Sequence, residues 1–264
     1  MNKHSYPFSD LNVWLSKAEG VDIFLPEKPS LDQVAASCAL ASSLNKSGKR
    51  AQVISPQLMK VEFNSVYGVN KVAHKIEGRS LVVEIDYPLE NVEKISWDDR
   101  QPKVRLMVQP KVGAPAIEEK MVSFSREGGR VEKAILFGIP SLDAWKSLVS
   151  QLGAAETSGA ELVSINIDQE TNFAQIPLVD TNASSYCEVV AALAEGLSLP
   201  MGEDEANNLL LGLQAATNFF TADNVGPDAF EAAAFCLRLG GKLKKKEENG
   251  RFAPPKIYRG SSLM

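Results

Sequence analysis

The stretch INIDQETNFAQIPLVDTNASSYCE, residues 165–188, decides the fold class of this chain. It begins within the apolar run LVSINI, which is typical of a buried parallel strand. Asp168 follows directly, at the position where α/β folds place their functional loops. Further along, Ser184 and Ser185 open an apolar helical pattern, and serines at a helix start either cap exposed amides or hold a phosphate. The stretch therefore predicts a strand, a functional loop and a helix.

The same alternation of strands and helices extends toward the N-terminus. The short apolar runs VDIFLP (21–26), AQVIS (51–55) and AILFGIP (134–140) predict buried parallel strands. Apolar residues at helical spacing lie between the first two runs, from Leu31 to Gly48, and a second helix is predicted across 141–152. Such strand–helix–strand units predict an α/β domain with a doubly wound parallel sheet.

Further helices are expected near both ends of this domain. Asp10 is predicted to cap a short first helix that ends at Gly20. Three more helices are predicted after the quoted stretch, one from Ser184, one across 203–218, and one between Pro227 and Gly240.

Residues 81–129 follow a different pattern. Short strand-like runs alternate there with charged or Gly/Pro turns, and no helical pattern lies between them. This predicts an inserted antiparallel β segment, so that the α/β domain comprises residues 1–80 and 130–241. The remaining residues, 242–264, contain a charge run and two prolines without periodicity and are predicted to form a flexible tail.

The quoted stretch resembles the signature of the DHH phosphoesterases, manganese enzymes that include oligoribonucleases, RecJ-type exonucleases and inorganic pyrophosphatases. In that signature an apolar strand delivers Asp-His-His, Thr-Asn follows, and a Ser-Ser-x-x-Glu helix start comes later. The matching residues here are Asp168, Thr171, Asn172, Ser184, Ser185 and Glu188. Gln169 and Glu170 stand where the family has its two histidines.

The resemblance covers roughly residues 21–80 and 131–241, and it implies where the other family motifs fall. The first motif, His-x-x-Pro-Asp-x-Asp, aligns with LPEKPSLDQ, so that Pro26 and Ser30 replace ligands and Asp32 remains. The aspartates of the second and fourth motifs align with Gly138 and Ala216. Either Asp86 or Asp143 is an alternative for the second-motif aspartate. The Gly-Gly-Gly-His motif of the family's second domain does not occur in residues 242–264.

These departures bear directly on the chemistry that the resemblance implies. A pair of Mn²⁺ ions needs bridging carboxylates to hold it and to generate a hydroxide for phosphoryl transfer. Only Asp32 and Asp168 match the family's metal cage, and Glu170 could ligate as a carboxylate. These three residues are predicted to form at most a residual site for one Mn²⁺ or Mg²⁺, so no cofactor and no catalytic residue is expected. Predicted ligand-binding residues are Thr171, Asn172, Ser184 and Ser185.

Structural roles are open for the same residues. Asp32 lies at a strand-to-helix junction, where a carboxylate stabilises helix amides and the helix dipole. Asp168 could bond to loop amides, and the serines could be N-caps. Three functions therefore remain open: a catalytically degenerate protein that binds another protein, a nucleotide or an oligonucleotide; a divergent metal-dependent phosphoesterase with a rebuilt site; and a purely structural protein.

Composition is that of an ordinary globular protein. The chain has 264 residues and a formal net charge of −5, so charge alone gives no general affinity for nucleic acid. Its three cysteines lie in apolar helical patterns and are predicted to be buried free thiols in a reducing compartment. No stretch is long and apolar enough to predict a membrane span or a signal peptide. A cytoplasmic protein without membrane contact is expected.

Overall fold

The computed structural model describes residues 6–76, 80–98, 103–127 and 129–245. They form two compact units, one built from Met1–Ile76 and Arg130–Met264 and the other from Glu77–Gly129. No helix among the described residues is long and apolar enough to cross a membrane.

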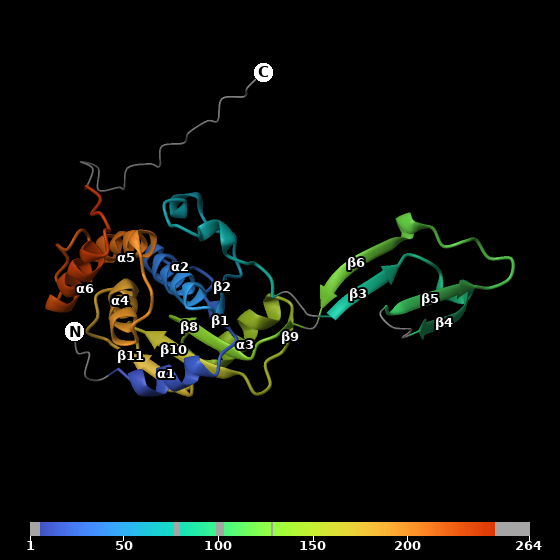
Figure 1. Ribbon diagram of the computed structural model, residues 1–264, viewed down its shortest axis with the longest axis horizontal. Helices are drawn as coiled ribbons and strands as arrows, with labels where there is room; N and C mark the ends of the chain where they lie inside the picture. Colours follow the sequence, from blue (N-terminus) through green and yellow to red (C-terminus); the bar gives the residue numbers. More distant parts are fainter. Residues whose placement is uncertain (1–5, 77–79, 99–102, 128, 246–264) are drawn as a thin grey trace, which may run out of the picture. The chain divides into compact units, whose positions relative to one another are not determined.

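A five-stranded parallel sheet forms the centre of the first unit (Figure 1), with the strand order β11-β10-β8-β1-β2. Its strands are β1 (Gly20–Phe24), β2 (Arg50–Ile54), β8 (Lys133–Phe137), β10 (Glu161–Asn166) and β11 (Ile176–Val179). The first four are the parallel strands predicted from the sequence. β11 was not predicted, because Pro177 interrupts its short apolar run, and proline is tolerated there only because β11 is an edge strand.

Helices cover both faces of this sheet, as a doubly wound fold requires. Alternate residues of β8 show the division, because Ile135 and Phe137 belong to one hydrophobic cluster while Ala134 and Leu136 belong to another. The first cluster includes residues of α1 (Phe8–Ser16), α2 (Leu31–Lys46), α4 (Tyr186–Gly196), α5 (Glu203–Ala216) and α6 (Pro227–Arg238). The second includes residues of α3 (Leu142–Gln151).

The start of α1 differs from the sequence prediction. The prediction that Asp10 caps this helix is wrong, because the helix already begins at Phe8 and Pro7 occupies the N-cap position. Asp10 lies instead in the first helical turn. Its carboxylate can still interact favourably with the positive end of the helix dipole from that position.

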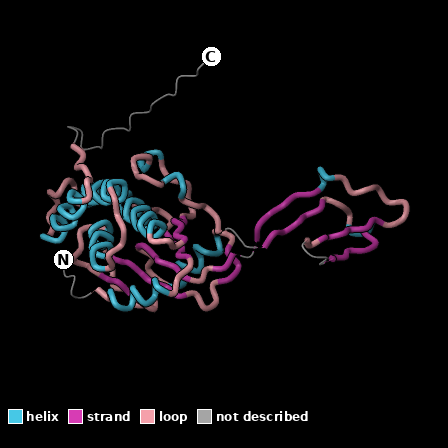
Figure 2. The backbone as a smooth tube through the Cα atoms, viewed as in Figure 1, coloured by secondary structure: helices cyan, strands magenta, loops and turns pink. Residues whose placement is uncertain are grey.

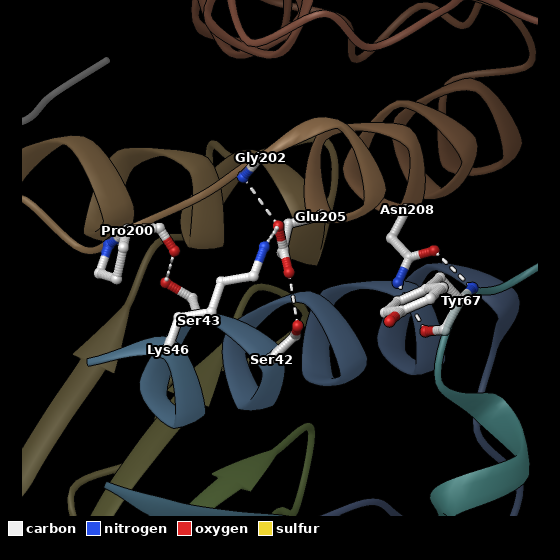
Figure 3. Close-up of polar contacts among 8 residues, drawn as sticks. All are labelled: Ser42, Ser43, Lys46, Tyr67, Pro200, Gly202, Glu205 and Asn208. Atoms are coloured by element: carbon white, nitrogen blue, oxygen red, sulfur yellow. Dashed lines mark hydrogen bonds and ion pairs between the residues drawn. The ribbon is translucent and has the colours of Figure 1, made fainter. Parts of the chain in front are cut away.

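Helix α5 is attached to α2 by a buried polar contact (Figure 3). The fully buried carboxylate of Glu205 accepts hydrogen bonds from the Ser42 hydroxyl, the Lys46 ammonium group and the Gly202 backbone N–H. One helical turn further along α5, the Asn208 amide bonds to both the N–H and the C=O of Tyr67, in the segment after β2. These contacts fix the position of α5, whose C-terminal end contributes to the site.

The second unit consists of two antiparallel hairpins, β3 (Ser80–Ile85) with β6 (Val122–Glu127) and β4 (Val92–Asp98) with β5 (Arg105–Pro110). This agrees with the strand-like runs in the sequence. Outside these hairpins, β7 (Gly129–Arg130) and β9 (Ala154–Glu156) form a two-stranded sheet. Short 3-10 turns are Val61–Phe63, Val69–Lys71, Leu89–Asn91 and Glu119–Met121.

The predicted tail begins with residues that contact α5. The backbone N–H of Lys242 donates to the Asn207 side chain, and Lys244 exchanges two hydrogen bonds with the Gln214 side chain. Residues 246–264 of the predicted flexible tail lie outside the described residues.

Candidate functional site

An open pocket of about 480 Å³ lies beyond the carboxyl ends of the central strands. In the sheet, β2 lies on one side of β1, and β8, β10 and β11 follow on the other side. The direction of strand addition therefore reverses between β1 and β8, which is the topological switch point. Doubly wound sheets bind their ligands at such a point. The residues that line the pocket are Ser30, Leu31, Asp32, Gln33, Ile167, Asp168, Ser184, Tyr186, Ala215 and Ala216.

Asp32 lies at the base of this pocket, and its buried carboxylate is fully engaged with helix α4. One carboxylate oxygen accepts from the Ser185 hydroxyl at 2.9 Å and from the Cys187 N–H at 3.1 Å. The other accepts from the Tyr186 N–H at 2.7 Å. Asp32 therefore binds the amides at the N-terminus of α4, although its own position in the sequence is the first turn of α2.

Two opposing effects act on this carboxyl group. Burial raises the pKa of Asp32 above its ordinary value, and the hydrogen bonds from Cys187, Tyr186 and Ser185 oppose that rise. The positive end of the α4 dipole adds to the stabilisation of the negative charge. Any cation at Asp32 would have to compete with three donors that already occupy both oxygens.

Close approach of α5 leaves little additional room at this carboxylate. Gly212 of α5 lies against Asp32, and a Cβ atom at position 212 would come within 2.9 Å of the nearer carboxylate oxygen and still closer to the Cys187 sulfur. A glycine is needed here because the helices are packed too tightly for any side chain.

A chain of hydrogen bonds crosses the pocket from α2 to the loop after β10. Ser30 and Gln33 form a reciprocal capping box at the start of α2. The Gln33 amide also bonds to the Tyr186 hydroxyl, which donates to a carboxylate oxygen of Asp168 at 2.9 Å. Burial and the neighbouring Asp168 raise the pKa of Tyr186, so its hydroxyl remains a neutral donor.

Gln33 and Tyr186 also fill the space in front of Gly138, the position aligned with the second-motif aspartate. A Cβ atom at position 138 would come within 2.8 Å of the Tyr186 hydroxyl oxygen and closer still to the Gln33 amide nitrogen. The backbone of Gly138 has a φ of 62°, a left-handed conformation that strains other residues. An aspartate at this position would need both side chains to move.

The structure brings some of the predicted site residues together and leaves others apart. Asp32, Asp168 and Ser184 line the pocket, and the buried Ser185 is the N-cap of α4. Glu170 and Asn172 are exposed and do not line it. Thr171 accepts a hydrogen bond from the buried Asn166 side chain at 2.9 Å. These three residues belong to the loop between β10 and β11.

The two alternative aspartates for the second motif also do not line the pocket. Asp143 lies in the first turn of α3, on the other face of the sheet, and Asp86 follows β3 in the second unit. Gln33 and Tyr186 are polar pocket residues that could not be singled out from the family resemblance. Their signals were the Ser-x-x-Gln pattern before an apolar helix, and the tyrosine directly after the paired serines.

The donor set does not fit a pair of divalent metal ions. Among the residues that the structure describes, no group of three or more His, Cys, Asp and Glu side chains is placed to hold a metal. Two bridged metals require several converging carboxylates or imidazoles. Here one of the two pocket carboxylates is buried and bonded to α4, and the other accepts from Tyr186.

The sheet and its helices define a doubly wound α/β protein with a partly polar pocket at the switch point. No protein-family model and no curated protein matches the sequence. Among solved structures, an exopolyphosphatase-related protein from Bacteroides fragilis matches with a TM-score of 0.60 and 13% identity, over 88% of this chain and 56% of that protein. This likeness shows that the chain shares the fold of that protein, a parallel sheet flanked by helices.

A second similar structure is a family II inorganic pyrophosphatase from Methanococcus jannaschii, with a TM-score of 0.45 and 13% identity, over 83% of this chain and 56% of that protein. Both proteins belong to the DHH superfamily. This chain thus spans little more than half the length of each. At this level of identity, the likeness to the first structure establishes the fold and leaves the activity of this chain open.

Proposed function

We propose that this chain is a catalytically inactive binding protein with a DHH-type phosphoesterase fold. The observation that carries the proposal is the state of Asp32, one of the two carboxylates that line the pocket. Both of its oxygens bond to the N-terminus of α4, so the residue acts as a structural cap. Three other positions of the family's metal cage are occupied by Ser30, Gly138 and Ala216, which supply no carboxylate.

The remaining polar groups of the pocket support binding without hydrolysis. Ser30, Gln33, Tyr186 and Asp168 satisfy one another through hydrogen bonds, which gives the pocket a defined shape without a metal. Tyr186 and Asp168 form the one hydroxyl–carboxylate pair among these four side chains, and the raised pKa of Tyr186 keeps its hydroxyl protonated. A pocket of this kind can hold a ligand through hydroxyl, amide and carboxylate contacts.

The charge of the pocket favours a protein partner over a nucleotide or an oligonucleotide. Asp32 and Asp168 line the pocket, and no lysine or arginine is among its lining residues in the described structure. A phosphate group would therefore meet negative charge without a cation to neutralise it. A protein segment that offers hydroxyl, amide or lysine groups fits this lining better.

Calorimetric titration with Mn²⁺, together with assays of pyrophosphate and short-oligonucleotide hydrolysis, tests the proposal directly. We expect no tight two-site binding of Mn²⁺ and no turnover, because the pocket lacks the carboxylates that would bridge two ions. Tight binding of two Mn²⁺ ions, or clear hydrolysis by the natural sequence, would establish the divergent phosphoesterase instead.

A matched pair of variants separates the structural role of Asp32 from a role in metal binding. Asp32→Asn should lower the free energy of unfolding by about 3 kcal/mol, since it places an amide donor among buried donors. Asp168→Asn should cost less than about 1 kcal/mol, because the side chain is exposed and accepts one bond from Tyr186. Similar small stability losses in both variants, accompanied by weaker Mn²⁺ binding, would contradict the capping role.

A further inference from the structure

Each hairpin of the second unit has one apolar face. In the β4–β5 hairpin, Ile95 pairs with Val108 and Trp97 pairs with Leu106, so these four side chains share a face. The opposite face carries polar side chains and one methionine, namely Lys94, Ser96, Asp98, Arg105, Met107 and Gln109.

The β3–β6 hairpin is built in the same way. Val83 pairs with Phe124 and Ile85 pairs with Val122, and Leu81 extends the same face by alternation. Glu84 and Ser123 pair on the opposite face. Both hairpins therefore have the alternation of sheets that are covered on one side only.

The described part of the second unit does not cover these faces. Trp97 is 72% exposed, Phe124 is 68% exposed, Leu81 is 61% exposed and Ile95 is 59% exposed. No hydrophobic side chain described in the range 80–124 is buried, and within this unit no described α-helix covers either hairpin (Figure 2). Two-stranded hairpins are marginally stable in water unless a hydrophobic face is packed against something. Exposed apolar surface of this extent marks an interaction site.

We propose that a second copy of this chain covers these faces, so that the protein forms a symmetric dimer through its β insertion. Half-exposed side chains of this size each present on the order of 100 Å², and together the two faces approach the roughly 800 Å² per partner that a stable interface needs. In a dimer with two-fold symmetry, the same apolar surface of each copy would form the interface.

Charge supports self-association over a strongly charged partner. Acidic and basic residues are nearly balanced in the insertion, so two copies approach without strong repulsion between like charges. Asp98 and Arg105, which pair across β4 and β5, place opposite charges on one polar face. The inference depends on the insertion alone and holds whether or not the pocket of the first unit is catalytic.

Tryptophan fluorescence provides the test, because Trp97 is the exposed tryptophan. Trp14 and Trp145 are only 5% and 1% exposed. We expect acrylamide to quench the fluorescence of Trp97 in dilute protein and to quench it less as the protein concentration rises. Sedimentation velocity should show dimers forming over the same range of protein concentration. Quenching that does not change with concentration would overturn the proposal, whether Trp97 remains open or is covered by its own chain.

A face-directed variant and a matched control locate the interface. Ile95→Thr combined with Leu106→Thr keeps strand-forming residues and the Trp97 probe, and should raise the dimer dissociation constant at least about tenfold through lost apolar burial. Met107→Thr, on the opposite face of the same hairpin, should leave it unchanged. Equal dissociation constants in the wild type and the double variant would refute the proposed faces, and circular dichroism of the helical unit confirms that each variant is folded.

Discussion

Asp22 shows at the scale of one residue how burial controls a charge in this fold. It lies in β1, where burial raises its pKa to about 6, although the neighbouring Arg50 acts in the opposite direction and Glu132 reinforces the rise. The ordinary value for this group is 3.8. The ionised form is thus disfavoured in the folded protein. Burial also raises the pKa of Asp32, but there hydrogen bonds to both carboxylate oxygens oppose the rise.

The raised pKa of Asp22 predicts a pH dependence of stability with a definite sign. Its contribution to stability is fully present below its ordinary pKa of 3.8 and is lost as the pH rises through about 6. From acidic to neutral pH, the wild type should therefore lose about 3 kcal/mol of unfolding free energy relative to Asp22→Asn. Urea unfolding of both proteins across this range measures the difference. A difference that stays constant with pH would contradict the prediction.

The sequence identifies the residues near the site better than it identifies their contacts. Strand ends and helix starts can be read from local patterns, which is why Asp32, Asp168 and Ser184 were singled out and lie at one pocket. The partner of the Asp32 carboxylate could not be read in this way, because helix α4 is more than 150 residues away in the chain. The contact between Gln33 and Tyr186 likewise depends on tertiary packing.

At the scale of elements, the attachment of α5 to α2 depends on one buried carboxylate. Hydrogen bonds from Lys46, Ser42 and Gly202 outweigh the effect of burial and lower the pKa of Glu205. Because α5 also contributes Ala215 and Ala216 to the pocket, this contact links the stability of the helix pair to the geometry of the site.

Replacing Glu205 should therefore destabilise the protein strongly. Glu205→Ala is expected to lower the free energy of unfolding by about 3 kcal/mol, since it removes the acceptor of three hydrogen bonds and leaves a cavity at a fully buried position. Lys46→Ala should cost about 1 kcal/mol or less, because the lysine side chain is half exposed and can be solvated. Chemical denaturation measures both values. Equal losses in the two variants would show that the ion pair between Lys46 and Glu205 provides most of the stabilisation, and that the other hydrogen bonds to the buried carboxylate provide little.

Most elements were predictable because their local patterns agree with their tertiary roles. The buried strands β1, β2, β8 and β10 are continuous apolar runs, and α2 to α6 have clear start and stop signals. β11 escaped prediction because an edge strand needs fewer apolar residues and tolerates Pro177. The start of the first helix was not predicted correctly, because Pro7 at its N-cap position has no capping side chain that would mark it in the sequence.

At the scale of the whole molecule, the insertion and the α/β unit should be separable. All five strands of the parallel sheet and every α-helix of the described structure come from outside Glu77–Gly129. Replacing residues 78–128 with a short Gly/Ser linker should therefore leave a folded unit that melts cooperatively. Circular dichroism on heating tests this expectation. Loss of helical signal or of cooperativity at moderate temperature would show that the first unit needs the insertion to fold.

The filled space in front of Gly138 limits how this chain could change through successive mutations. A carboxylate introduced at position 138 would meet Gln33 and Tyr186, and removing Gln33 first would break the capping box of α2. If Asp32 bound a metal instead, the backbone N–H groups at the start of α4 would be buried without a hydrogen-bond acceptor. Each single step toward a metal cage lowers stability before any metal can bind. Acquiring a metal site through single substitutions would therefore pass through poorly folded intermediates.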